Sequence, residues 1–149
     1  MRDGCGNGRF CPDDVVTRGQ AVSLLVRARG LAPVGGQRFS DVPPTSTHAS
    51  AINAAVAAGI VTGYADGTFA PDAVVTRDQL ASLLAKAKGL ARRPGQFFTD
   101  VPWTSPHLAN VNAIGEARLT TGCGGGRYCP YGITSRGQMA TLVAKAFPR

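Results

Sequence analysis

Residues 63–71 read Gly-Tyr-Ala-Asp-Gly-Thr-Phe-Ala-Pro, and this glycine-rich stretch decides the fold because its pattern occurs three times in the chain. Residues 4–12 and residues 122–130 carry the same pattern, displaced by 59 residues on either side without insertion or deletion. Self-similarity at a fixed period is typical of repeat architectures, in which each unit packs against its neighbours. The sequence therefore predicts three related units.

Each glycine-rich stretch lies between two other recurring segments. The motif Phe-x-Asp-Val-Pro occurs at residues 39–43 and 98–102, and a short Ala-rich segment follows each copy. After the glycine-rich stretch, a Thr/Ser-Arg pair opens a longer segment with apolar periodicity. We expect residues 1–31 to be the C-terminal half of the first repeat, residues 39–90 the second and residues 97–147 the third, together forming one structural domain.

The first unit begins inside its glycine-rich stretch, without the Phe-x-Asp-Val-Pro motif or the first helix. We expect a fragment or a misplaced start codon rather than a natural domain boundary, with a passenger region and an export signal on the upstream sequence. No apolar run approaches the roughly 18 residues of a membrane span, so we expect no membrane insertion.

Three long helices are predicted from apolar residues spaced at i, i+3, i+4 and i+7, over residues 17–29, 76–88 and 135–146. Hydroxyl side chains stand at each predicted N-cap, namely Thr17, Thr76 and Ser135, and Gly30 and Gly89 stand at predicted C-terminal stops. The apolar stripes include Leu24, Leu25, Leu83, Leu84, Leu142 and Val143. Such equivalent helices are expected to form a central three-helix bundle about a pseudo-threefold axis, in a mainly α fold.

The short first helices and the turns are also predicted from local signals. Ser105-Pro106 is expected to supply an N-cap and a first helical proline, and Ile52, Val56 and Ile60 a buried stripe. The dipeptides Asn7-Gly8, Asp66-Gly67 and Gly125-Gly126 tolerate positive φ and predict small hairpins between the helices. The aromatic side chains Phe10, Phe69 and Tyr128 are expected to fold back onto the helices.

The four cysteines occur in pairs at equivalent positions of two units. Cys5 and Cys11 of unit one recur as Cys123 and Cys129 in unit three, whereas unit two has Tyr64 and Ala70 there. Joint presence or absence predicts the disulfides Cys5–Cys11 and Cys123–Cys129, and hence an oxidising compartment outside the cytoplasm. A four-thiolate zinc site shared by both loops is the alternative, although Cys-x5-Cys is not the usual zinc spacing. We expect no metal and no cofactor.

The charge balance indicates an anionic partner. Sixteen basic residues against nine acidic ones give a formal net charge of +7. The basic residues are spread along the chain without a row of interleaved aromatic side chains, so we expect no nucleic-acid binding. His48 and His107 are repeat equivalents, expected to be capping or surface residues, and no nucleophile–base or metal constellation accompanies them. We therefore expect no catalytic residues and no enzyme activity.

Taken together, the segments at residues 39–43, 59–71 and 75–77 resemble the S-layer homology repeat, and the Gly-Cys and Cys-Pro pairs of residues 122–130 resemble its actinobacterial-type variant. The resemblance implies a three-repeat spindle whose grooves bind a secondary cell-wall polysaccharide, often with pyruvylated sugars. It implies ligand-binding roles for the motif arginines, Arg18, Arg77 and Arg136, and for Gly63 and Gly122. The glutamate of the family's Thr-Arg-Ala-Glu motif is Gln20, Gln79 or Gln138 here, and its tryptophan is missing near Thr47 and Pro106.

These features predict a non-catalytic, extracellular module that binds an anionic cell-wall polysaccharide attached to peptidoglycan. Arg18, Arg77 and Arg136 are singled out because a basic residue recurs there in every unit. A guanidinium near a helix N-terminus needs a compensating group, which is either a bound anion or a carboxylate such as Asp41 or Asp100. The alternative function is a protein-interaction or self-assembly module of a secreted or surface-layer protein.

Overall fold

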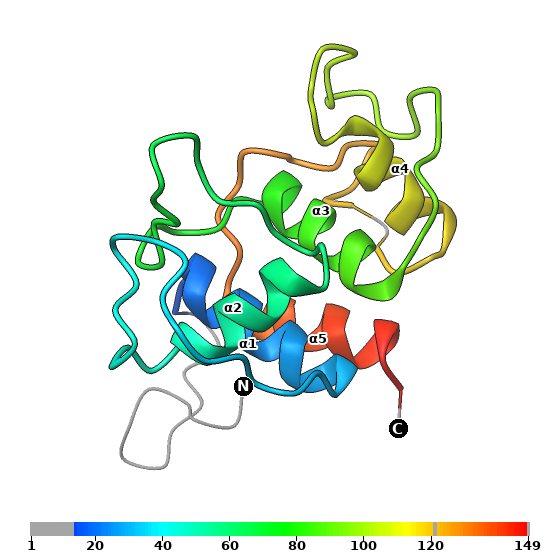
Figure 1. Cartoon of the computed structure of the whole chain (residues 1–149). Helices are drawn as coiled ribbons and strands as arrows, with labels where there is room; N and C mark the ends of the chain where they lie inside the picture. Colours follow the sequence, from blue (N-terminus) through cyan, green and yellow to red (C-terminus); the bar gives the residue numbers. More distant parts are fainter. Residues whose placement is uncertain (1–13, 121, 149) are drawn as a thin grey trace.

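The structure is a computed structural model that describes residues 14–120 and 122–148. Within these residues the regular structure consists of five helices and no strands (Figure 1). Long and short helices alternate along the chain as α1 (Arg18–Arg29), α2 (Ala49–Ala57), α3 (Arg77–Lys88), α4 (Leu108–Glu116) and α5 (Arg136–Ala146). The predicted mainly α class is confirmed. None of these helices is long and apolar enough to cross a membrane.

The three long helices begin with the same capping box. At each start the side-chain Oε1 of the glutamine at N3, which is Gln20, Gln79 or Gln138, accepts the backbone N–H of the N-cap residue at 3.1 Å. The hydroxyls of Thr17 and Ser135 accept the N–H of N3 in return. Because a neutral amide oxygen completes the box, the glutamate of the family pattern is not required for the helix start.

A closed triangle of backbone hydrogen bonds ties the three helix starts together. Val16 donates its N–H to the Thr134 carbonyl, Thr134 donates to Val75, and Val75 donates to Val16, at 3.1, 3.1 and 2.9 Å. The three residues are 59 positions apart in sequence and occupy the same place in each unit. C-terminal to these three residues, the helices α1, α3 and α5 contact one another pairwise, as expected for a pseudo-threefold bundle.

The predicted helix stripes form the core of this bundle. Leu25, Leu83 and Leu84 are buried, and Leu24, Leu142 and Val143 are partly buried against them. Gly30 and Gly89 end α1 and α3 at φ values of 75° and 78°, in the left-handed region that glycine tolerates. The expected packing and helix ends are therefore confirmed.

Each short helix packs on the long helix that precedes it, α2 on α1 and α4 on α3. The predicted stripe of α2 is largely confirmed, because Ile52 and Ile60 are buried and Val56 is partly buried. The predicted start of α4 is wrong. Its N-cap is His107, and the Ser105 hydroxyl accepts the His107 N–H at 3.1 Å in a turn that precedes the helix. Serine hydroxyls favour such local turns as readily as helix caps.

The glycine-rich stretches form tight loops rather than strand pairs in the described residues. Tyr64 donates its N–H to the Thr68 carbonyl at 2.8 Å, and Cys123 donates to Arg127 at 2.9 Å, but the ladder does not extend beyond an isolated bridge. Phe69 and Tyr128 are buried, as predicted. Phe10 and Asn7-Gly8 lie outside the described residues.

Candidate ligand-binding groove

Arg18 and Arg77 each hold the glycine-rich loop of the following unit. Their Nε atoms donate to the backbone carbonyls of Phe69 and Tyr128, at 2.9 and 2.8 Å. Each guanidinium also lies over the ring of the same aromatic residue, with its carbon 4.4 Å from the Phe69 centroid and 4.7 Å from the Tyr128 centroid. These contacts supply the compensation that an arginine at a helix N-terminus needs.

The junction between neighbouring units also includes backbone hydrogen bonds and a tyrosine hydroxyl. The first-turn amides of Arg18 and Arg77 donate to Ala73 and Gly132 in the next unit, both at 2.8 Å. The Tyr128 hydroxyl donates to the Arg77 carbonyl at 2.9 Å. Burial raises the pKa of Tyr128 well above its usual value, so the phenol remains a donor in alkaline solution. Both arginines are thus part of the junction between units.

Asp41 and Asp100 brace the loops instead of pairing with the arginines. The carboxylate of Asp41 accepts the backbone N–H groups of Phe69 and Ala70 at 2.9 and 2.8 Å. The carboxylate of Asp100 accepts those of Tyr128 and Cys129 at 2.7 and 2.8 Å. The suggested pairing of arginine with Asp41 or Asp100 is therefore wrong, because both carboxylates are engaged by amides and both Nε atoms by carbonyls.

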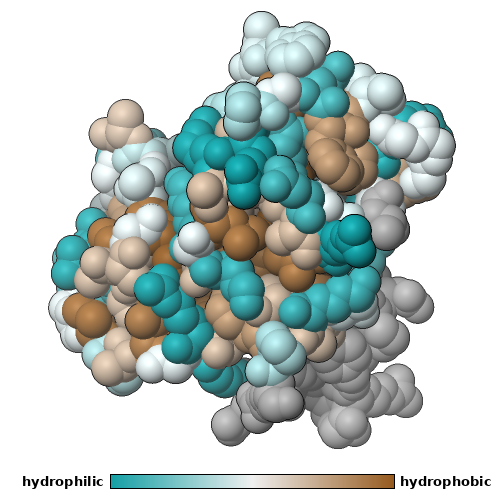
Figure 2. All heavy atoms as spheres, turned by 90° about the vertical axis from the view of Figure 1, so that its right-hand side faces the viewer, coloured by the Kyte–Doolittle hydropathy of each residue, from teal (hydrophilic) through white to brown (hydrophobic). Residues whose placement is uncertain are grey.

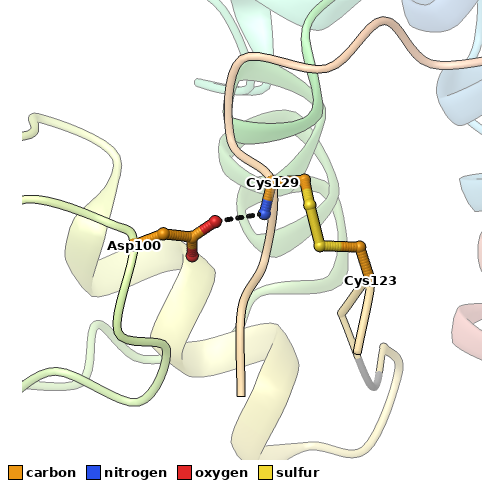
Figure 3. A group of neighbouring side chains, drawn as sticks. All are labelled: Asp100, Cys123 and Cys129. Carbon is orange, nitrogen blue, oxygen red and sulfur yellow. Dashed lines mark hydrogen bonds between the residues drawn. A yellow bond between two sulfur atoms is a disulfide. The ribbon is translucent and has the colours of Figure 1, made fainter. Parts of the chain in front are cut away.

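The loop of unit three is also closed covalently. Cys123 and Cys129 form a disulfide with a Cα–Cα distance of 6.1 Å, beside the Asp100 carboxylate (Figure 3). The candidate ligand atoms of Asp100 and the two cysteines lie within 4.8 Å of one another. Both sulfurs are bonded to each other and the carboxylate accepts two amides, so this group braces the loop. The predicted Cys5–Cys11 bridge lies outside the described residues.

Gly63 and Gly122 lie against aromatic rings of their own units. A Cβ atom at Gly63 would come within 2.2 Å of the Phe39 ring, and one at Gly122 within 2.9 Å of the Phe98 ring and 2.2 Å of the Arg127 carbonyl oxygen. Both glycines also have positive φ, at 74° and 80°. Close packing explains why glycine occupies both positions, while the predicted ligand contact there stays a prediction.

A groove of about 480 Å³ lies where α1, the start of α2 and the start of α5 meet. Polar groups come from Gln20, Ser23, Thr47, His48 and Ser50, apolar groups from Leu24, Val26, Leu31, Pro33 and Ala51, and basic groups from Arg27 and Arg136. Arg136 is 4 % exposed, so it lines the groove as an almost fully buried residue, whereas Arg27 is exposed. Of the predicted ligand residues, Arg136 lines this groove, whereas Arg18, Arg77, Gly63 and Gly122 do not.

His48 connects α1 and α2, two of the helices that form the groove. Its Nδ1 lies 2.6 Å from the Ser23 hydroxyl of α1, and His107 makes the equivalent 2.7 Å contact with Ser82 of α3. Neither histidine caps its helix through the side chain. The expectation that the histidines are capping or surface residues therefore misses their role, which is to connect one unit with the next.

Arg27 belongs to a second basic position that sequence reasoning misses. Lys86 and Lys145 occupy the same place in units two and three, so a basic residue recurs there as well. The shift of 59 residues that relates Arg18, Arg77 and Arg136 would have revealed it. The groove thus combines one residue from each recurring basic position, drawn from two different units.

Comparison with known sequences identifies the repeat. A sequence model of the S-layer homology domain matches residues 38–81, which run from the segment before α2 into α3. The chain therefore contains an S-layer homology domain. The surface layer protein of Brevibacillus choshinensis is 34 % identical over 91 residues, which cover 58 % of this chain and 8 % of that protein.

Two further relatives are proteins of different kinds. Cell surface glycoprotein 1 of Acetivibrio thermocellus is 26 % identical over 98 % of this chain and 7 % of its own length. An endoglucanase of Bacillus sp. strain KSM-635 is 40 % identical over 52 % of this chain and 8 % of its own length. The chain spans less than a tenth of each of these relatives.

The relatives also indicate where the protein is located in the cell. Two of the three are a surface layer protein and a cell surface glycoprotein, so this chain is a module of the cell wall or cell surface. A disulfide suits that location, because disulfides persist in oxidising compartments.

Proposed function

We propose that this module anchors a larger protein to the cell surface by binding an anionic cell-wall polysaccharide, without catalysis. The observation that carries the proposal is the groove between α1 and α2, whose lining combines Arg27 and Arg136 with polar and apolar side chains. Sugar rings present both hydroxyl groups and apolar faces, and carboxylate or phosphate substituents match guanidinium donors. The net charge of +7 favours the approach of such a polymer.

The repeat extends the proposal to all three predicted arginines. In the cyclic order given by the Val16, Thr134 and Val75 triangle, Arg136 is followed by Arg18 and then by Arg77. By this equivalence, we propose that Arg18 and Lys86 contribute to a second binding site at the junction of α3 and α4. Arg77 and Lys145 would contribute to a third at α5. The Ser82–His107 contact of α3 and α4 supports the equivalence, because it repeats the Ser23–His48 contact of the groove. A polymer with repeating acidic groups, such as pyruvylated sugars, could span these junctions.

The proposal is tested by sedimentation of the protein with purified cell-wall sacculi. Arg27→Gln removes one exposed charge of the groove and is expected to weaken binding about tenfold, because a charge-assisted hydrogen bond contributes about 1.5–3 kcal/mol. Arg92→Gln is the matched control, because Arg92 is exposed and lies outside the groove. Added salt should weaken binding of the parent protein.

Two results would contradict the proposal. One is equal binding of the Arg27 variant and the Arg92 control. The other is undiminished binding after the polysaccharide is chemically stripped from the peptidoglycan, which would leave peptidoglycan or a protein as the partner.

A further inference from the structure

α5 presents a face whose counterparts on α1 and α3 are covered. α1 contacts α2 and α3 contacts α4, whereas among the described residues α5 contacts only α1 and α3. The repeat shift therefore allows α5 to be compared residue by residue with two helices that already have a short helix against them.

The comparison shows that the corresponding face of α5 is open. Ala140 and Ala144 occupy the places of Val22 and Val26 in α1 and of Ala81 and Ala85 in α3. All four counterparts are buried, whereas Ala140 is partly exposed and Ala144 is exposed. The amino-acid types are small and apolar in each case, so α5 keeps the character of a docking face.

A hydroxyl at the centre of this face has a different partner from its counterparts. Ser23 and Ser82 contact Nδ1 of His48 and His107 on the short helices. Thr141 stands at the same position of α5, is exposed, and donates its hydroxyl to the Gly137 carbonyl of its own helix at 3.0 Å. A hydroxyl is thus present on α5 where a histidine-bearing helix would contact it.

A hollow lined by apolar and basic residues runs along the same part of α5. It has a volume of about 710 Å³, and its aliphatic part is formed by Ala140, Val143 and Ala144 of α5 with Leu24 and Ala28 of α1. Its remaining lining residues are Arg27, Lys88, Ala146, Phe147 and Pro148. Figure 2 views the side of the molecule that bears α4, α5 and the C-terminus, and apolar surface is visible there between hydrophilic residues.

We propose that this face of α5 binds a short helix of the same type as α2 and α4, preceded by a histidine. The two existing interfaces define its chemistry. Ile52 and Val111 provide a branched apolar side chain, and Asn53 and Asn112 provide a buried amide. Asn53 donates to the carbonyls of Val34 and Gly36, and Asn112 donates to those of Arg93 and Gly95, which fixes the segment before each helix. The inference is independent of polysaccharide binding.

The probe is a synthetic peptide of residues 96–119, which carries α4 and the segment before it. Titration into isotopically labelled protein should give saturable one-to-one binding, with chemical-shift changes at Ala140, Thr141 and Ala144. Ala144→Glu should abolish these changes by placing a charge on the face. Ala58→Glu, an exposed alanine at the end of α2, is the matched control and should bind like the parent.

Tethering the peptide to the protein tests the same interaction even if the free peptide binds weakly. The same segment, joined to the protein through a flexible linker, should raise the unfolding temperature by about 3 °C or more, and Ala144→Glu should cancel the gain. Absence of both peptide binding and thermal gain would overturn the proposal. Self-association of the parent protein that Ala144→Glu abolishes would also overturn it, since the face would then bind a second copy.

Discussion

The loops of units two and three are anchored by the same contacts, although a disulfide closes the second of them and their tips turn differently. Gly124 and Gly125 have positive φ, at 105° and 62°, whereas their counterparts Ala65 and Asp66 do not. An aspartate accepts two loop amides in both, and the residue after the buried aromatic has positive φ in both, 58° at Ala70 and 59° at Cys129. Unit three adds the Cys123–Cys129 bond. In unit two the Tyr64 ring lies beside Arg18 instead, 5.1 Å from the guanidinium carbon.

This comparison teaches that noncovalent contacts anchor both loops in the same way, whether or not a disulfide is present. The aspartate brace, the buried aromatic ring and the arginine of the preceding unit are present in both loops, whereas the disulfide is present in one of the two described. The disulfide is therefore expected to add stability without changing how the loop is anchored.

The largest effect is expected from removing the brace. Asp41→Ala and Asp100→Ala should each lower the free energy of unfolding by about 3 kcal/mol, because two amides lose a charged acceptor. Denaturant unfolding measures the loss, with Asp72→Ala as a control at an exposed position. If Asp100→Ala proved harmless while the disulfide is intact, the covalent bond would be what shapes that loop.

A smaller effect is expected from removing the disulfide. Replacing both Cys123 and Cys129 by alanine should lower the free energy of unfolding by about 2 kcal/mol, since a short closed loop no longer restricts the unfolded chain. The amide resonances of Tyr128 and the Asp100 brace should stay near their parent positions. Loss of those resonances would mean that the two loops differ in what holds them.

The smallest effect concerns the positive φ of unit two. Ala70→Gly should raise the free energy of unfolding by about 0.5 kcal/mol, because glycine relieves the left-handed conformation but also loosens the unfolded chain. Thermal unfolding of the variant and the parent measures the change. Clear destabilisation would show that the Ala70 methyl group contributes packing that outweighs the strain.

Periodicity was enough to predict the parts of the fold that local sequence controls. The helix starts at Thr17, Thr76 and Ser135 and the burial of Phe69 and Tyr128 follow from residue types at repeated positions, and the structure confirms them. Helix caps and apolar stripes depend on neighbours within a few residues, which the sequence displays directly.

The partners of polar side chains could not be predicted in the same way. Arg18 binds the Phe69 carbonyl rather than Asp41, and His48 contacts Ser23 rather than capping α2. These choices depend on how one unit docks against the next, and several donors and acceptors compete for each group. The groove also draws Arg27 and Arg136 from opposite ends of the chain, a juxtaposition that only the threefold closure creates.

The most direct measurement is a residue-resolved chemical-shift titration of the protein with a soluble fragment of the cell-wall polysaccharide. We predict saturable changes at Leu31, Thr47 and Ser50, which line the groove from the end of α1 and the start of α2, and their loss in Arg27→Gln. Changes confined to the exposed loop tips at residues 65–67 and 124–126, with the groove resonances unmoved, would contradict the proposal that this groove holds the wall polymer.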